Sequence, residues 1–328
     1  MVIVTGATGL LGSVIVRRLL KEEISVVALK RINSDTSSLQ DIANAIRWID
    51  SDILDLTGLN EEFKKADLVI HCAAHVSFDP REEETLLKVN VEGTKNIVNA
   101  CLTHGVSKLI HISSVAALGR QKGVIAIDET AKWVDSPLNS AYGKSKYLAE
   151  LEVYRGMEEG LSATIVCPSF ILAPSNWDKS SSQIFQYVWK ENKFSSNGIS
   201  NYVDVEDVAE LVYQIYHKNI FGERFIASAG NISFENLFRE IARRFNKKSP
   251  SIKVAPFLLS VFARLEEIRC LLLRTKPLIT RESIKSTREN FVYSNKKSVL
   301  QLQMHYKPLQ ETLDRCCSYF LDIYSIKK

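Results

Sequence analysis

The chain has 328 residues, more than one hydrophobic core usually organises, so one large domain or two interlocked domains are expected. Hydrophobic residues make up 45% and charged residues 24%, an ordinary globular balance that argues against disorder. The net charge of +4 is spread along the chain, which argues against a nucleic-acid partner.

The six cysteines lack the spacing of zinc ligands, and several lie in apolar runs, so a reducing cytoplasm is the simpler expectation. A strand-like run that starts at Val2 leaves no room for a leader peptide. The apolar stretch 254–273 contains four charged residues, whereas a membrane span needs about 20 uninterrupted apolar ones. We therefore expect no stable membrane insertion. The preferred role of 256–273 is a lid over an apolar substrate, with a dimer face or an interfacial helix as alternatives.

Short β-branched runs alternate with longer helical patterns through the first two-thirds of the chain, which is typical of βαβ units and a parallel sheet. In chain order, the expected elements are strand Met1–Thr5, helix Leu10–Lys21, strand Ser25–Leu29, strand Ile46–Asp50, strand Asp67–Ala73, helix Leu86–His104, strand Lys108–Ser113, helix Ala141–Gly156 and strand Ala163–Pro168.

After Pro174 the pattern loosens; a strand-to-helix pattern follows at Tyr202–His217 and a further strand at Glu223–Ala227. The remainder is mainly helical. The expected fold class is α/β, a doubly wound parallel sheet with a smaller, mainly helical C-terminal cap. We expect residues 1–170 to bind a nucleotide and 171–328 to bind the substrate, with 201–228 returning to the first domain.

A glycine loop directly follows the first strand and opens the first helix. Gly6 permits a tight turn, Gly9 lets the backbone approach a pyrophosphate, and Gly12 allows close packing of helix on strand. The free N–H groups at the start of the helix then face the phosphates. The residues expected to bind a dinucleotide here are Gly6, Thr8, Gly9, Leu10, Leu11 and Gly12.

Tyr142 and Lys146 lie four residues apart on an expected helix, so their side chains share one face. A phenol is a poor base at neutral pH unless its anion is stabilised, and a nearby ammonium favours that anion. Ser113 and Ser114 stand upstream at the end of an expected strand. This combination indicates a proton-transfer site.

The GxxGxxG spacing, the tyrosine–lysine pair and the upstream serines resemble the extended branch of the short-chain dehydrogenase/reductase superfamily. This NAD-dependent epimerase/dehydratase family includes sugar-nucleotide epimerases and dihydroflavonol reductase-like enzymes, and the resemblance covers nearly all of residues 1–230. It implies a Rossmann domain. It also implies a homodimer formed through the helices after the fourth and fifth strands.

The resemblance implies roles for four catalytic residues. Tyr142 would donate or accept the proton, and Lys146 would hold the nicotinamide ribose. Ser114 would polarise the substrate oxygen, with Ser113 as the neighbouring alternative. Asn90 would support the active-site backbone and a proton relay.

Further cofactor contacts follow from the same resemblance. Asp52 and Ile53 resemble the pair that contacts adenine. The run Ala73, Ala74 and His75 resembles the turn against the ribose and nicotinamide, and Pro168, Ser169 and Ile171 resemble the segment beside the carboxamide. The run 202–209 resembles a structural signature of the extended branch, and the runs 276–280 and 306–309 resemble reductase-like members.

The second strand ends at Lys30-Arg31, where an NAD site commonly has a carboxylate for the ribose 2′-hydroxyl. Arg31 suits a 2′-phosphate instead, so NADP is favoured over NAD. His71 and His75 do not predict a metal site, because the strand ends between them and no third ligand has a suitable spacing.

The leading hypothesis is an NADP-dependent carbonyl reductase or alcohol dehydrogenase acting on a small molecule. The alternative is a nucleotide-sugar epimerase or dehydratase with tightly held NAD. Against it, the carboxylate of the second strand is absent, and Ser200-Asn201 stand where many epimerases have Arg-Asp. A third hypothesis, a non-catalytic dinucleotide sensor, is disfavoured because both Tyr142 and Lys146 are present.

Overall fold

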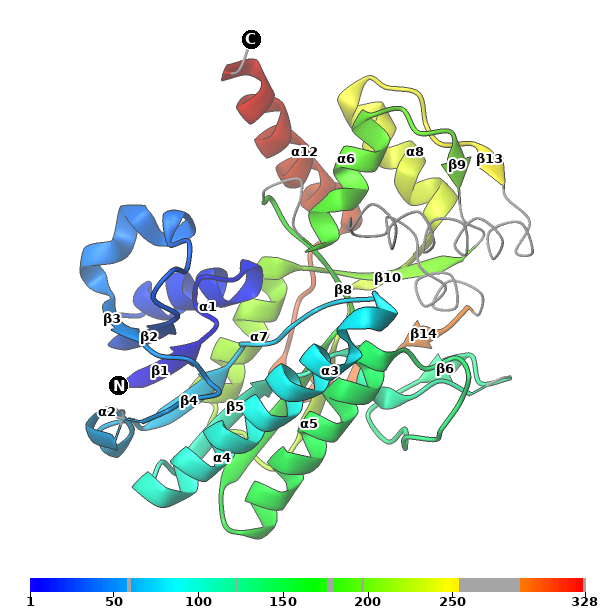
Figure 1. Ribbon diagram of the computed structural model, residues 1–328. Coiled ribbons are helices and arrows are strands. Elements are labelled where there is room, and N and C mark those ends of the chain that lie inside the picture. The colour runs from blue at the N-terminus through cyan, green and yellow to red at the C-terminus, as the bar shows by residue number, and fades with distance from the viewer. Residues whose placement is uncertain (58–59, 122, 176–179, 196–197, 254–289, 327–328) are drawn as a thin grey trace.

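A seven-stranded parallel sheet forms the centre of the molecule, as seen in a computed structural model (Figure 1). The structure describes residues 1–57, 60–121, 123–175, 180–195, 198–253 and 290–326. The expected lid at 256–273, the run 276–280 and Cys270 lie outside these residues. The strand order is β11-β7-β5-β4-β1-β2-β3, and the doubly wound parallel sheet expected from the sequence is confirmed. Its strands are β1 (Val2–Thr5), β2 (Val26–Lys30), β3 (Arg47–Asp50), β4 (Leu68–His71), β5 (Lys108–Ile112), β7 (Ser162–Pro168) and β11 (Arg224–Ala227).

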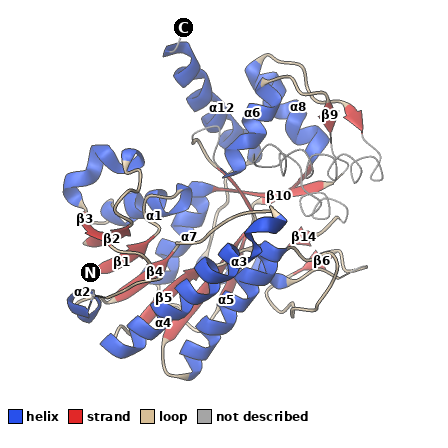
Figure 2. Ribbon diagram, in the orientation of Figure 1, coloured by secondary structure: helices blue, strands red, loops and turns tan. Residues whose placement is uncertain are grey.

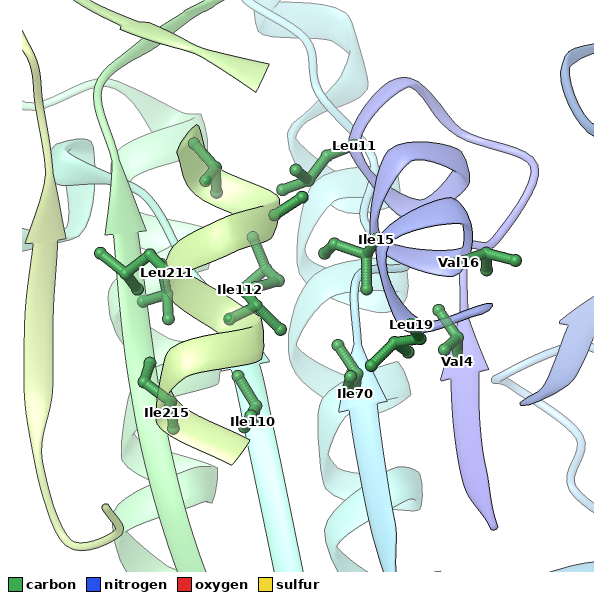
Figure 3. Close-up of a cluster of buried hydrophobic side chains, with 14 of the residues drawn as sticks. Val4, Leu11, Ile15, Val16, Leu19, Ile70, Ile110, Ile112, Leu211 and Ile215 are labelled. Atoms are coloured by element: carbon green, nitrogen blue, oxygen red, sulfur yellow. The ribbon is translucent and has the colours of Figure 1, made fainter. Parts of the chain in front are cut away.

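The central strands are apolar on both faces because each face is covered by helices. On one face, α1 (Leu10–Leu20) and α7 (Val205–His217) pack against β1, β4 and β5. Figure 3 shows Ile15 of α1, Leu211 of α7 and Ile110 of β5 within this cluster. On the other face, α4 (Gly93–His104) and α5 (Ala141–Glu158) form the second core (Figure 2).

The expected long helix over Leu86–His104 is interrupted, and its start was wrong. The structure has η2 (Pro80–Glu82), α3 (Glu83–Leu86) and a π-helical segment, η3 (Leu87–Glu92), before α4. A π segment inserts an extra residue into the helix and commonly occurs at functional sites. The π segment contains Asn90, whose side chain forms hydrogen bonds with the backbone of His75 in the loop after β4.

The segment 201–228 is shared between two layers. β10 (Ile199–Asp204) pairs with β8 (Phe170–Leu172) and β12 (Gly230–Ser233) in a separate three-stranded sheet, whereas α7 and β11 lie with the large sheet. The helices α6 (Gln183–Trp189), α8 (Phe234–Phe245) and α12 (Leu309–Ile326) lie above the large sheet in Figure 1. Their apolar side chains form the C-terminal core.

Short elements complete the chain. No helix among the described residues is long and apolar enough to cross a membrane. The remaining elements are η1 (Ser37–Ala45), α2 (Asn60–Lys64), η4 (Val115–Leu118), β6 (Ala126–Ile127), η5 (Ser180–Ser182), β9 (Phe194–Ser195), β13 (Ile252–Lys253), β14 (Val292–Tyr293) and α11 (Lys296–Leu302).

Candidate active site

The glycine loop lies where the strand order reverses, between β4 and β2 at the carboxyl end of β1. Gly6 has a φ of +64°, and a Cβ there would lie 2.7 Å from the backbone nitrogen of Ala73. A Cβ on Gly12 would overlap the carbonyl oxygen of Gly6. Both positions therefore require glycine, which keeps the first turn of α1 close to the end of β4.

The first turn of α1 is open to a ligand. Gly9 is the N-cap residue and contributes no side-chain hydrogen bond, and no acidic residue lies in the first turn. Gly9 is exposed, Thr8 and Leu10 are partly exposed, and Leu11 is buried against the core. The unsatisfied N–H groups and the helix dipole at such an end attract phosphate. The loop thus fits the pyrophosphate of a dinucleotide.

Tyr142 of α5 lies beside Ser114, which follows the end of β5. Ser140 caps α5 by accepting from the Gly143 N–H at 3.0 Å, and Gly143 is needed because a Cβ would lie 2.8 Å from the carbonyl oxygen of Ala116. This close approach brings the Tyr142 phenol into hydrogen-bond contact with the Ser114 hydroxyl. Burial raises the pKa of Tyr142 to about 12, and the Ser114 hydrogen bond opposes this shift.

Lys146 lies one turn further along α5 and is almost fully buried. Its ammonium donates to the carbonyl oxygen of Ile112, the last residue of β5, at 2.8 Å. Burial lowers the pKa of Lys146 to about 8, and the Glu150 carboxylate opposes that shift. The predicted pair therefore lies on one face of α5, and both members contact the carboxyl end of β5.

The two serines at the end of β5 have different partners. Ser114 is half-buried, contacts Tyr142 and caps η4 by accepting from the Ala116 N–H at 3.2 Å. Ser113 is buried and donates to Glu150 at 2.5 Å. Of the two alternatives left by the sequence, Ser114 is the one beside the phenol.

Asn90 is buried in the π segment and bridges two parts of the site. Its Oδ1 accepts from the His75 N–H at 2.7 Å, and its Nδ2 donates to the His75 carbonyl oxygen at 3.0 Å and to the Ser145 hydroxyl at 2.9 Å. Ser145 in turn donates to the carbonyl oxygen of Tyr142 at 2.8 Å. Asn90 thus fixes the loop after β4 relative to the helix that carries the tyrosine.

A buried chain of hydrogen bonds, which no motif in the sequence indicated, lies below the glycine loop. His71 contacts Thr5 at 2.7 Å through Nδ1 and Thr94 at 3.1 Å through Nε2, and Thr94 donates to the carbonyl oxygen of Asn90 at 2.6 Å. Because Thr94 donates its one hydroxyl proton to Asn90, His71 Nε2–H must donate to Thr94. Burial lowers the pKa of His71 to about 3, which keeps this ring neutral.

The other predicted cofactor residues lie at the carboxyl ends of the strands. Ala73 donates its N–H to the Thr5 hydroxyl at 3.2 Å, Ala74 is exposed, and the His75 ring contacts Glu82 at 3.0 Å. On the β3 side, Asp52 accepts from the Leu54 N–H at 2.9 Å, and Ile53 packs against Gly93.

Pro168 ends β7, Ser169 follows it and Ile171 belongs to β8, on the opposite side of β1 from β2. Pro168 and Ser169 are buried, whereas Ile171 is partly exposed and pairs with Val203 of β10. The Ser169 hydroxyl is buried and has no hydrogen-bond partner in the described part of the chain. These residues therefore lie where the large and small sheets meet.

Arg31 lies exposed just beyond β2. The neighbouring Lys30 is ion-paired with Asp50, whereas the Arg31 guanidinium has no ion-pair partner among the described residues. Arg31 is therefore the free cation at this strand end.

Asn201 has a structural partner in the C-terminal part of the chain. Its amide donates to the carbonyl oxygen of Phe291 at 2.7 Å and accepts from the Tyr293 N–H at 3.2 Å. The adjacent Ser200 is buried. Neither residue presents a cation at this position.

Phe78, which the sequence analysis also missed, lies edge-on to Tyr142 with ring centroids 5.9 Å apart. It is 38% exposed, and the neighbouring Val76 is 54% exposed. No sequence signal indicated these residues, because they lie in a loop without a motif. The ring of Phe78 places an apolar surface beside the phenol.

The chain is similar to proteins of known family. A model described as the NAD dependent epimerase/dehydratase family matches residues 2–225. A Synechocystis protein provisionally named dihydroflavonol 4-reductase is 29% identical, over 97% of this chain and 93% of its own length. Cinnamoyl-CoA reductase 1 from Oryza sativa subsp. japonica is 27% identical, over 77% of this chain and 78% of its own. The crystal structure of gox2253 has a TM-score of 0.84 and 31% identity, with 98% of each chain covered.

Proposed function

The chain belongs to the NAD dependent epimerase/dehydratase family, and from this premise we propose that it is an NADP-dependent reductase that interconverts a carbonyl and an alcohol. Members of this family are NAD(P)-dependent enzymes. The finer assignment, a net reduction with NADPH, is our inference from the site.

The observation that carries the proposal is the contact between the Tyr142 phenol and the Ser114 hydroxyl, with the Lys146 ammonium one turn away on the same helix face, where it donates to the end of β5. A carbonyl oxygen placed between the two hydroxyls would accept a hydrogen bond from each. The nicotinamide supplies the hydride that reduces the carbonyl carbon. Tyr142 gives its proton to the oxygen as negative charge develops there, Ser114 donates a hydrogen bond to the same oxygen, and Lys146 stabilises the phenolate that remains.

The strand ends offer a matching site for the cofactor. The capless first turn of α1, with Gly6 and Gly12 where a Cβ would collide with backbone, fits the pyrophosphate. Asp52 and Ile53 would contact the adenine, and Ala73 to His75, with Pro168, Ser169 and Ile171, would contact the nicotinamide half. Arg31, an exposed cation without an ion-pair partner among the described residues, supports a 2′-phosphate and therefore NADP.

An apolar small molecule is the substrate class that we favour. Phe78 provides apolar surface beside Tyr142, and Val76, two residues earlier in the same loop, is a further exposed apolar side chain. The names of the two curated relatives denote reductases of aromatic compounds. Nucleotide-sugar turnover has less support, because Asn201 is held by backbone groups of Phe291 and Tyr293, and Ser200 supplies no charge for a diphosphate.

The proposal is tested by following NADPH oxidation with a panel of aryl and alkyl aldehydes and ketones, and by repeating the assay with NADH. We expect turnover with NADPH and a clear preference for it over NADH. A preference for NADH would remove the argument from Arg31. Conversion of UDP- or TDP-sugars without a net change in cofactor absorbance would favour the epimerase alternative.

Tyr142→Phe tests the role of the phenol. We expect it to retain NADPH binding, measured by fluorescence, and to lose about 10²–10⁴-fold in kcat, because general acid catalysis contributes about that much. Tyr147→Phe is the matched control, since Tyr147 lies on the same helix but stacks on Trp133 at 4.7 Å. Turnover that survives in Tyr142→Phe would contradict the proposed mechanism.

A further inference from the structure

Three residues of α5 contact three consecutive residues at the end of β5. Tyr142, Lys146 and Glu150 are spaced four residues apart, so they lie on one helix face. Tyr142 contacts Ser114, Lys146 donates to the carbonyl oxygen of Ile112 at 2.8 Å, and Glu150 accepts from Ser113 at 2.5 Å. The first two contacts belong to the proposed reaction, whereas Glu150 has no role in it.

Glu150 is a carboxyl group buried inside the protein, with 1% of its surface exposed. Its Oε1 accepts from Ser113 and from the Cys167 thiol at 3.5 Å, and its Oε2 pairs with Arg224 of β11 at 3.2 Å. A carboxyl group so deeply buried is costly unless it is paired and hydrogen-bonded. Ser113 after β5, Cys167 of β7 and Arg224 of β11 supply the hydrogen bonds and the positive charge that this burial requires.

The donor pattern indicates the ionised form. Ser113, Cys167 and Arg224 all present hydrogens to Glu150, and an ionised carboxylate only accepts. Burial raises the pKa of Glu150 above its ordinary value, and Ser113, Arg224 and Cys167 oppose that shift without cancelling it. We assign Glu150 the charged form because the Arg224 guanidinium contacts one carboxylate oxygen. The Ser113 hydroxyl and the Cys167 thiol donate to the other oxygen.

We propose that Glu150 is a positioning residue of the tyrosine–lysine centre. Its buried carboxylate is the counter-charge that keeps the Lys146 ammonium protonated, and through Ser113 it holds the strand end that carries Ser114. This inference rests on the proposed function, because it gives Lys146 and Ser114 their roles. Glu150 itself need not touch the substrate or the cofactor.

The groups around Lys146 explain why a counter-charge is needed. His71 of β4 and His111 of β5 are buried and neutral, with the pKa of each lowered by burial. Cys72 and Cys167 are thiols whose pKa is raised by burial, so they remain uncharged. Among the described groups that act on Lys146, the one with a persistent negative charge is Glu150.

Two other titratable side chains, Arg224 and Tyr154, interact with Glu150. Arg224 of β11 is its cationic partner, and its guanidinium also donates to the carbonyl oxygens of Glu129 and Ala131. Tyr154, one turn further along α5, has a pKa that burial raises, so it stays neutral. Glu150 is therefore shared between a structural cation and the lysine of the site.

The test measures the ionisation of Lys146 directly, by Cε–Nζ correlation NMR of the full chain labelled at lysine, with Lys146→Arg to assign the signal. In Glu150→Gln, which keeps the size of the side chain and removes its charge, we expect Lys146 to titrate about one pH unit lower than in the wild type. Glu150→Asp retains the charge and should leave the titration of Lys146 close to that of the wild type. An unchanged Lys146 titration in folded Glu150→Gln would overturn the proposal.

Glu152→Gln is the matched control. Glu152 lies on the same helix and pairs with Arg155, away from the site, so the same loss of charge should leave Lys146 unaffected. If Glu150→Gln does not fold, the Glu150 carboxyl carbon is measured in the wild type by ¹³C NMR. An ionised Glu150 at pH 7 supports the proposal, and a protonated one overturns it.

The kinetic readout separates this inference from the proposed function. If the chain is a reductase, the alkaline limb of its kcat/KM profile should move to lower pH in Glu150→Gln, by the same amount as the Lys146 titration. If Lys146 shifts as expected and no carbonyl compound is reduced, the proposed function fails while the role of Glu150 as the lysine's counter-charge stands.

Discussion

At the scale of single residues, the site contains two groups whose pKa values are shifted in opposite directions, that of Tyr142 upward and that of Lys146 downward toward neutral pH. Burial raises the pKa of Tyr142 to about 12, so the phenol keeps its proton across the whole working range. Burial lowers the pKa of Lys146 to about 8, so its charge is lost at a pH where ordinary lysines keep theirs. Carbonyl reduction requires the protonated form of both.

The first consequence is a one-sided pH profile. Below about pH 8 both groups are protonated, so their ionisation should not change the rate of reduction. Above about pH 8, Lys146 loses its charge, and the phenolate formed at Tyr142 loses the ammonium that stabilises it. We expect kcat/KM for carbonyl reduction, which at saturating NADPH reports the enzyme–NADPH complex, to fall about tenfold per pH unit above about 8. Steady-state rates between about pH 6 and 10, with saturating NADPH and limiting carbonyl compound, measure this. A profile that stays level to pH 10 would contradict the assignment of Lys146.

The serines show what the sequence leaves open at this scale. Two consecutive residues at a strand end point in different directions, so Ser113 and Ser114 share a motif but reach different partners. Which of them meets Tyr142 depends on how closely α5 approaches the strand end, and that approach is allowed by Gly143 opposite Ala116. Glu150 could have been found, because it lies one helical turn beyond Lys146; its partner Arg224, 74 residues away, could not.

At the scale of elements, the strands with a regular apolar pattern were predicted well, whereas an element that depends on contacts with distant residues was not. The strands of the large sheet carry β-branched apolar runs, and all seven begin and end within two residues of expectation. The π segment Leu87–Glu92 was missed because its periodicity is that of a helix. The side chain of Asn90 binds the backbone of His75, fifteen residues earlier, and the residues around Asn90 could not predict that contact.

The glycine loop allows a prediction that separates folding from binding. In Gly12→Ala the new Cβ overlaps the carbonyl oxygen of Gly6, so we expect a loss of about 2–3 kcal/mol in the free energy of unfolding. In Gly9→Ala the Cβ would lie 3.1 Å from the same oxygen, so the cofactor-free protein should stay near wild-type stability. Because position 9 is exposed and faces the proposed pyrophosphate, Gly9→Ala should nevertheless weaken NADPH binding at least tenfold. Urea unfolding and fluorescence titration measure the two effects, and equal stability of both variants would contradict this assignment.

At the scale of the whole molecule, the C-terminal helix connects the cap to the large sheet. α12 packs its apolar side against α8 and α6, and its Arg315 reaches the start of α7. Arg315 donates to the fully buried Asp204 at 2.5 Å and to Glu206 at 2.9 Å. Nearby, Lys307 binds Asp207 through both its backbone N–H and its ammonium, each at 2.8 Å. The run 202–209 thus joins layers that are more than 100 residues apart in the sequence, which no local pattern could reveal.

Arg315→Ala should therefore destabilise the molecule well beyond the loss of a surface ion pair. It leaves the Asp204 carboxylate buried, with the Glu206 N–H at 2.8 Å as its remaining donor among the described residues. Removing one partner of a buried pair typically costs 3–5 kcal/mol, and Arg315 is 30% exposed, so we expect about 2–3 kcal/mol in urea unfolding. Arg239→Ala is the matched control, because its pair with Glu235 is 62% exposed on the arginine side and should contribute less than about 1 kcal/mol. Equal losses in the two variants would show that the Asp204 pair does not hold the cap to the sheet, and that the apolar contacts of α12 suffice.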